Sequence, residues 1–117
     1  MSAGYHHFVI EQGTTFGQTL TLKDSSDTVI NLTGYISAEM DLRENPDAAT
    51  PLITLTMSNS RIALGGTAGT ITLTISASDT ANLQAGDGHY DLEIANNGGN
   101  VYRLLEGTYS VRRNVSR

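Results

Sequence analysis

The chain has no cysteine, no tryptophan and only two prolines, and 16% of its 117 residues are charged. Without cysteine, disulfides within the chain and thiolate metal sites are excluded. A globular domain averages about 25% charged residues. Here threonine, glycine, isoleucine and leucine are abundant instead, which favours strands and turns over helices. The net charge of -5 argues against a nucleic acid as partner, because phosphate binding requires clustered lysine and arginine.

Long apolar runs are also missing. No segment approaches the roughly 20 consecutive apolar residues that a membrane helix needs. Residues 1–7 lack the charged region and the apolar region of a secretory signal. We therefore expect neither a membrane partner nor export through the general secretory route.

Alternation of apolar and polar residues dominates the sequence, and it is typical of strands that bury one face. Four segments alternate clearly: 36–42, 53–58, 70–75 and 90–94. In the first of them the even-numbered residues, from Ile36 to Leu42, are expected to face a core. Weaker patterns predict further strands at 8–11, 16–22, 61–64, 101–106 and 108–112.

Turn signals separate these segments, at 31–34, 45–47, 65–69 and 96–100. Ser76 followed by Asp79 resembles a capping box and predicts a short helical turn near 77–83 that carries the chain from one sheet to the other. The pattern predicts an all-β fold, an immunoglobulin-like antiparallel β-sandwich of about 7–9 strands. We expect a flexible N-terminal arm over 1–7 and a single domain over 8–117.

The histidine, serine and carboxylate residues do not form a recognisable catalytic or metal-binding motif. His6 and His7 are adjacent, so on an extended segment they point in opposite directions and chelate a metal poorly. No Gly-x-Ser-x-Gly elbow occurs. Two carboxylate pairs share strand faces and are more typical of a solvated face than of a glycosidase: Glu39 with Asp41, and Asp91 with Glu93. We expect no enzymatic activity, no cofactor and no metal.

Seven short motifs then follow one another in a familiar order: IEQGTTF (10–16), LTGY (32–35), RIALGG (61–66), GTITL (69–73), ANLQAG (81–86), YDLE (90–93) and VYRLLEGT (101–108). In this order they resemble a family of small tail-associated virion proteins of tailed bacteriophages, and they are similar to the N-terminal domain of phage baseplate upper proteins. The resemblance covers nearly the whole chain.

The resemblance implies an immunoglobulin-like sandwich that is present in several symmetric copies in the tail region of a virion, after assembly in the host cytoplasm. It implies an adaptor that joins tail or baseplate parts, or attaches a receptor-binding fibre, through contacts with other phage structural proteins. The family offers no catalytic residues to transfer. Two alternatives stay open: a capsid decoration protein on the phage head, and a glycan-binding module.

The candidate interfaces lie near the two ends of the chain. A sandwich has edge strands to which a neighbour can add a strand, and the segments 8–22 and 108–115 are either such edges or ordinary internal strands. Aromatic residues and arginine are enriched at interface hot spots. The interface candidates are therefore Tyr5, Phe8, Phe16, Tyr109, Arg112 and Arg113. The terminal arginines fit a solvated tail as well as a docking site.

A glycan-binding site would need exposed aromatic rings on which sugars stack. Tryptophan is absent and aromatic residues make up only 6% of the chain, which counts against this alternative. It would gain support if the following side chains clustered on one exposed face: Tyr5, Tyr35, Tyr102 and Tyr109.

Overall fold

The computed structural model describes residues 4–24, 26–45, 47–48 and 50–113. These residues form nine strands: β1 (Gly4–Tyr5), β2 (Phe8–Glu11), β3 (Phe16–Thr21), β4 (Tyr35–Arg43), β5 (Ile53–Thr56), β6 (Ile62–Leu64), β7 (Thr70–Ile75), β8 (Gly86–Asn96) and β9 (Val101–Arg112). A 3-10 turn, η1 (Gly66–Ala68), precedes β7, and a short helix, α1 (Ala77–Ala81), follows it. The prediction of an all-β fold with one short helix near 77–83 is confirmed.

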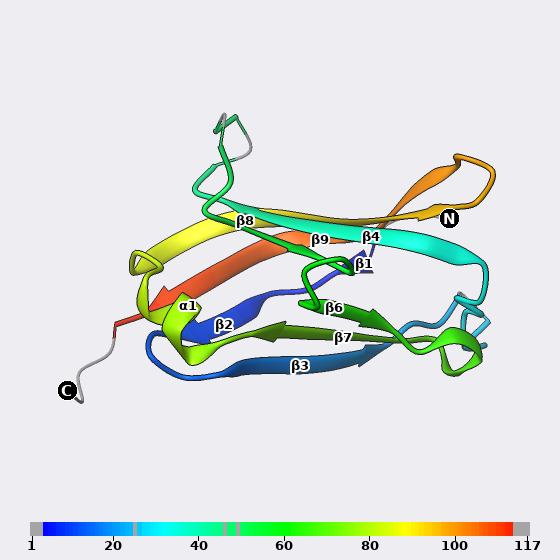
Figure 1. Ribbon diagram of the computed structural model, residues 1–117, viewed down its shortest axis with the longest axis horizontal. Coiled ribbons are helices and arrows are strands. Elements are labelled where there is room, and N and C mark those ends of the chain that lie inside the picture. The colour runs from blue at the N-terminus through cyan, green and yellow to red at the C-terminus, as the bar shows by residue number, and fades with distance from the viewer. Residues whose placement is uncertain (1–3, 25, 46, 49, 114–117) are drawn as a thin grey trace.

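The strands form two sheets that lie face to face, as the upper and lower layers of Figure 1 show. The larger sheet has the order β1-β9-β8-β4-β5, with β2 also paired to β9, and the smaller has the order β3-β7-β6. β1 and β2 run parallel to β9, whereas the other pairs are antiparallel. The molecule is therefore a two-layer sandwich in which the first strands lie beside the last.

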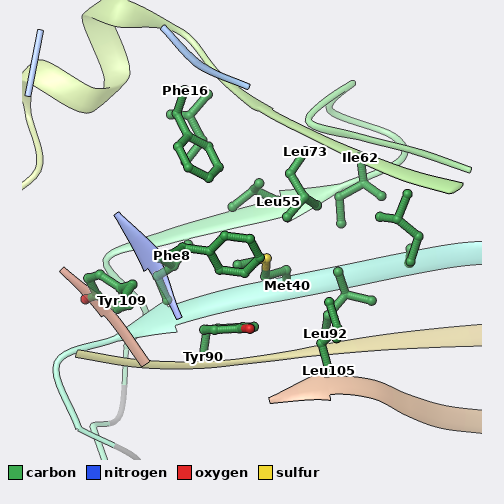
Figure 2. Close-up of a cluster of buried hydrophobic side chains, with 14 of the residues drawn as sticks. Phe8, Phe16, Met40, Leu55, Ile62, Leu73, Tyr90, Leu92, Leu105 and Tyr109 are labelled. Atoms are coloured by element: carbon green, nitrogen blue, oxygen red, sulfur yellow. The ribbon is translucent and has the colours of Figure 1, made fainter. Parts of the chain in front are cut away.

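The core fills the space between the two sheets. Ile71, Leu73 and Ile75 of β7 are all buried, as the alternation predicted. They join Leu92 and Ile94 of β8 in one cluster, and Figure 2 shows side chains from both layers meeting there. Burial of each such aliphatic side chain stabilises the fold by roughly 1.5–3 kcal/mol.

One residue of the alternating pattern departs from the prediction. Ile36 was expected to face the core with Ala38, but its side chain is 60% exposed. The pairing of β4 with β8 shifts register between Tyr35 and Ser37. Such a bulge rotates the strand locally, so Ile36 lies outside the buried face that resumes at Ala38.

The expected N-terminal arm is partly built into the larger sheet. Tyr5 pairs with Glu106 of β9, and the N–H of His6 donates to the carbonyl of Glu106 over 3.3 Å. The Tyr90 hydroxyl donates to the carbonyl of His6 over 2.7 Å. The sheet thus begins at Gly4 and not at the expected boundary of residue 8, while residues 1–3 lie outside the described part.

The turn between β7 and β8 matches its prediction in detail. Ser76 caps α1, because its Oγ accepts a hydrogen bond from the N–H of Asp79 over 3.2 Å. Leu83, just beyond the helix, is buried at the edge of the core. The Thr80 hydroxyl donates to the Thr14 carbonyl over 2.7 Å, which ties α1 to the connection between β2 and β3. The helix therefore joins the two layers.

Candidate functional site

Charged residues gather on the outer face of the larger sheet. Outward-facing acidic residues on β4 and β8 lie directly opposite one another, Glu39 opposite Glu93 and Asp41 opposite Asp91. Glu106 of β9 lies opposite Asp91 on the other side. This acidic arrangement, which we call the acidic face, places like charges in neighbouring positions, where they repel each other.

Arginine side chains offset part of that repulsion. Arg103 reaches three carboxylates, at 3.5 Å from Asp91 and 3.8 Å from both Glu93 and Glu106. Glu39 has no such partner among the ion pairs of the described residues. The charge of Asp41 beside it raises the pKa of Glu39, with further contributions from burial and from Glu93. The acidic face is therefore only partly neutralised.

A hollow of about 550 Å³ lies on this face, where β1 meets β9, β8 and β4. Positively and negatively charged side chains line the hollow together with one prominent aromatic ring. The lining includes Tyr5, Asp41, Arg43, His89, Asp91 and Arg103. The Tyr5 side chain is 73% exposed. Such a surface can form polar contacts with a partner or a sugar. Among the described residues, no group of three or more His, Cys, Asp or Glu side chains could hold a metal ion.

A hydrogen-bonded cluster beside the hollow contains serine, histidine and aspartate. Ser110 Oγ donates to Asp87 Oδ1 over 2.7 Å and lies 3.2 Å from His7 Nε2. His7 Nδ1 lies 2.7 Å from the Thr108 hydroxyl. Because Ser110 gives its only proton to Asp87, the neutral ring of His7 donates from Nε2 to Ser110 and accepts at Nδ1 from Thr108. In this arrangement His7 is not placed as a base toward the serine. The cluster links the connection between β1 and β2 to β8 and β9 on the surface.

The outer face of the smaller sheet is different in chemistry. β3, β6 and β7 contain no charged residue, and their outward positions carry small or hydroxyl-bearing residues: Gly17, Thr19, Thr21, Ala63, Thr70, Thr72 and Thr74. The hydroxyls of Thr19 and Thr72 lie 3.2 Å apart across two strands. We call this surface the threonine face. A neighbour could approach it without meeting a net charge.

The edges of the two sheets also differ. At the outer edge of β5, the carbonyl of Thr54 accepts from Asn59 Nδ2 and from Arg61, each over 3.0 Å. The N–H of Thr56 donates to Asn59 Oδ1 over 3.0 Å. These side chains occupy the backbone groups that an incoming strand would need. No comparable contact is found at the outer edge of β3 within the described residues.

Three of the six interface candidates prove to be core residues. Phe8, Phe16 and Tyr109 are 1%, 8% and 2% exposed, so we withdraw them as side chains that contact a partner. Figure 2 shows all three turned toward the space between the layers. The Phe8 ring packs edge-on against Phe16, with ring centres 5.9 Å apart. Sequence reasoning missed this because an aromatic residue in an alternating segment suits a core as well as an interface.

The other three candidates are exposed but are not brought together. Tyr5 lies at the hollow, whereas Arg112 ends β9 and lies 3.9 Å from Glu11 of β2. Arg113 follows it and is exposed. Of the two alternatives for 108–115, the topology supports an ordinary internal strand, because β9 is paired on both sides, with β8 and with β2; residues 114 and 115 lie outside the described part. The segment 8–22 does supply edges, β2 and β3.

The tyrosines do not cluster as a glycan-binding platform would require. Tyr35 and Tyr102 contact each other edge to face at 6.1 Å and are half-buried. Tyr109 is buried, and only Tyr5 presents its ring freely. Burial, and then the nearby Tyr5, raise the pKa of Tyr90, which keeps its hydroxyl protonated as the donor to His6.

In structural class the chain is a small two-sheet β-sandwich with one acidic and one threonine-rich outer face. No protein-family model matches it, and a search of curated proteins returns no significant match. No helix within the described residues has the length and apolar character needed to cross a membrane.

Proposed function

We propose that this protein is a structural component of a tailed bacteriophage, an adaptor that joins tail or baseplate parts by protein–protein contacts. The observation that carries the proposal is the contrast between two exposed sheet faces on opposite sides of one core. A domain of this kind can contact two chemically different neighbours at once. The ordered motifs from residue 10 to residue 108 support the same role.

We also infer that the sandwich is immunoglobulin-like. In such domains the C, F and G strands form one sheet and the B, E and D strands contribute to the other. β4, β8 and β9 have the positions of C, F and G, with β5 added beside β4, and β3, β7 and β6 have the positions of B, E and D. An experimental structure in which β4 pairs with β7, and not with β8, would argue against the correspondence to this topology.

The role as an adaptor rests on binding and not on catalysis. Candidate reactive side chains lie on a sheet surface, and the serine of the cluster beside the hollow has its proton engaged by Asp87. Burial that excludes water from reacting groups is a common requirement of catalysis. We therefore place the function in the contacts that the two faces make.

The test is to locate the protein in purified particles of the phage or prophage that encodes it. Cryo-electron microscopy should find several symmetric copies in the tail or baseplate. Density on the head lattice would instead identify the alternative, a capsid decoration protein. Absence from particles, checked by mass spectrometry of the same preparation, would overturn both virion roles.

One observation favours a second candidate, a glycan-binding module. Tyr5 is exposed at a hollow whose carboxylates, Asp41 and Asp91, could accept hydrogen bonds from sugar hydroxyls, and an exposed ring can stack under a sugar. Screening on a glycan array, with Tyr5→Ala as the control, tests this directly. Binding that is lost in Tyr5→Ala would support it, whereas no binding by the wild-type protein would remove it.

A further inference from the structure

The outer edge of β3 exposes backbone groups in a regular pattern. The N–H of Leu22 donates to the carbonyl of Gly69 over 2.8 Å, and the β3–β7 register places these residues opposite each other. In an antiparallel ladder, pairs that exchange hydrogen bonds alternate with pairs that do not. The even-numbered residues of β3 therefore bond to β7, and Gly17, Thr19 and Thr21 direct their N–H and C=O groups away from it.

β3 is also the least protected edge of the sandwich. Edge strands are usually kept from pairing by shortness, charge, proline, a bulge or a covering group. β1 has two residues and β6 has three, and β2 has four and ends in the charged Glu11. β5 also has four residues and is further covered by Asn59 and Arg61. β3 has six residues, FGQTLT, with no charge and no proline, and its register with β7 is unbroken. In Figure 1 it is the lowest strand, and no ribbon of the described residues runs along its outer side.

We propose that β3 pairs with β3 of a second copy of this chain, antiparallel across a two-fold axis at Thr19. The two threonine faces then continue into one sheet, in the order β6-β7-β3 followed by β3-β7-β6. Thr19 lies opposite Thr19 of the partner subunit, and Gly17 lies opposite Thr21 of the partner subunit. Each of these opposed pairs exchanges both of its N–H···O bonds.

The sequence of β3 suits this symmetric register. Across a two-fold axis the same surface must be complementary to itself, and opposed threonines form favourable cross-strand pairs. On the inner face the axis sets Gln18 opposite Leu20 of the partner subunit. Both of these residues are half-buried at the open side of the sandwich, so pairing covers more of the Leu20 side chain and leaves no charge buried.

Charge distribution favours a second copy as the occupant. Two copies, each with a net charge of -5, repel one another where their acidic faces approach. The smaller sheet contains no charged residue in its three strands. Contact through β3 therefore joins the copies along the sheet with the fewest like charges. This inference does not depend on a role in a virion.

The experiment is sedimentation velocity of the purified full chain from about 1 µM to about 1 mM. The wild-type protein should shift from one chain of 12.5 kDa to a species of twice that mass. Thr19→Lys sets two like charges opposite each other at the axis and should weaken association about tenfold or more. Its matched control is Thr72→Lys, which adds the same charge to the same face one strand inside the edge and should change association less than twofold.

A second variant separates loss of pairing from loss of folding. Thr19→Pro removes an N–H that points to the free edge, a position where proline is tolerated, so circular dichroism should stay that of the wild type while the dimer is lost. Three outcomes would overturn the proposal: a wild-type protein that stays monomeric at about 1 mM, a dimer that survives both Thr19 variants, or equal weakening by Thr19→Lys and Thr72→Lys. If the copies in the tail occupied symmetric positions without pairing with one another through β3, the dimer proposal would be wrong and the adaptor role would still hold.

Discussion

The two sheets of the sandwich share one core but treat their outer surfaces in opposite ways. The larger sheet has an acidic outer face, a β5 edge covered by Asn59 and Arg61, and a first strand fastened over Gly107 of β9. The smaller sheet has an uncharged outer face and an open edge at β3. The shared core constrains only the inner side chains of each sheet, so the outer surfaces can differ in chemistry. The larger sheet exposes charged side chains, and the smaller sheet exposes backbone N–H and C=O groups along β3.

The largest expected effect comes from replacing Gly107 with alanine. A Cβ at this position would overlap the carbonyl oxygen of His6, so the N-terminal strand must shift from β9 or the sheet must bend. We expect Gly107→Ala to lower the free energy of unfolding by about 2–3 kcal/mol, measured by urea denaturation at micromolar protein concentration.

The smaller sheet offers the matched control for that variant. A Cβ at Gly17 of β3 meets nothing within 4 Å, and its backbone is not in the left-handed region. Gly17→Ala should therefore raise the free energy of unfolding by about 0.5 kcal/mol, because alanine restricts the unfolded chain. Equal responses of the two variants would contradict the claim that Gly107, unlike Gly17, lies under a close backbone approach.

A smaller effect is expected from the arginine that covers the β5 edge. Arg61 donates to the Thr54 carbonyl over 3.0 Å and to Asp79 Oδ2 over 2.7 Å, and these contacts join β5 to α1. The hydrogen bond from Arg61, followed by that of Ser76, lowers the pKa of Asp79. Arg61→Ala should lower the free energy of unfolding, as measured by chemical denaturation. The lost charge-assisted hydrogen bond to Thr54 by itself accounts for about 1.5 kcal/mol of that decrease.

Arg103→Ala provides the comparison on the acidic face. Arg103 has more acidic neighbours, but its contacts are longer and its side chain is half-exposed. Exposed ion pairs contribute little to stability, so Arg103→Ala should lower the free energy of unfolding by about 0.5 kcal/mol. If Arg103→Ala proved the more damaging of the two, the acidic face and not the covered edge would be the main source of stability outside the core.

Local patterns in the sequence predicted the parts of the fold that depend on neighbouring residues. Alternation identified the buried face of β7, and the spacing of Ser76 and Asp79 identified α1 with its cap. The turn at 96–100 was likewise readable as the link between β8 and β9. These features are local because the periodicity of a strand and the cap of a helix are set within a few residues.

Features that join distant segments could not be predicted. The first strand pairs with the last, about a hundred residues along the chain, and nothing in either segment specifies the other. The partners of Arg103 depend on the β8–β9 register, which shifts between Leu92 and Glu93. The exposure of Ile36 follows from another such shift. The acidic face therefore appeared in the sequence as two separate carboxylate pairs, with no sign that they lie side by side.

The smallest effect concerns the pH dependence that the acidic face imposes. Its neighbours, Asp41 above all, raise the pKa of Glu39 above its ordinary 4.5, so the folded protein binds this proton more tightly than the unfolded chain. Stability from this group is then fully present below pH 4.5 and is lost as pH rises through the folded pKa. The free energy of unfolding of Glu39→Gln should equal that of the wild type near pH 3. At pH 7 it should be higher than that of the wild type by roughly a few tenths of a kcal/mol, a small gain because solvent screens these exposed charges.

Denaturation curves at a series of pH values, for Glu39→Gln beside Glu106→Gln, would measure this difference. Glu106 lies on the same face but is paired with Arg103 at 3.8 Å, so its replacement should bring no gain at pH 7. A gain of the same size in both variants would mean that the total charge of the face, and not the crowding of Glu39 by Asp41 and Glu93, sets the pH dependence. Because the smaller sheet has no charged strand residue, its contribution to stability should stay constant over the same range.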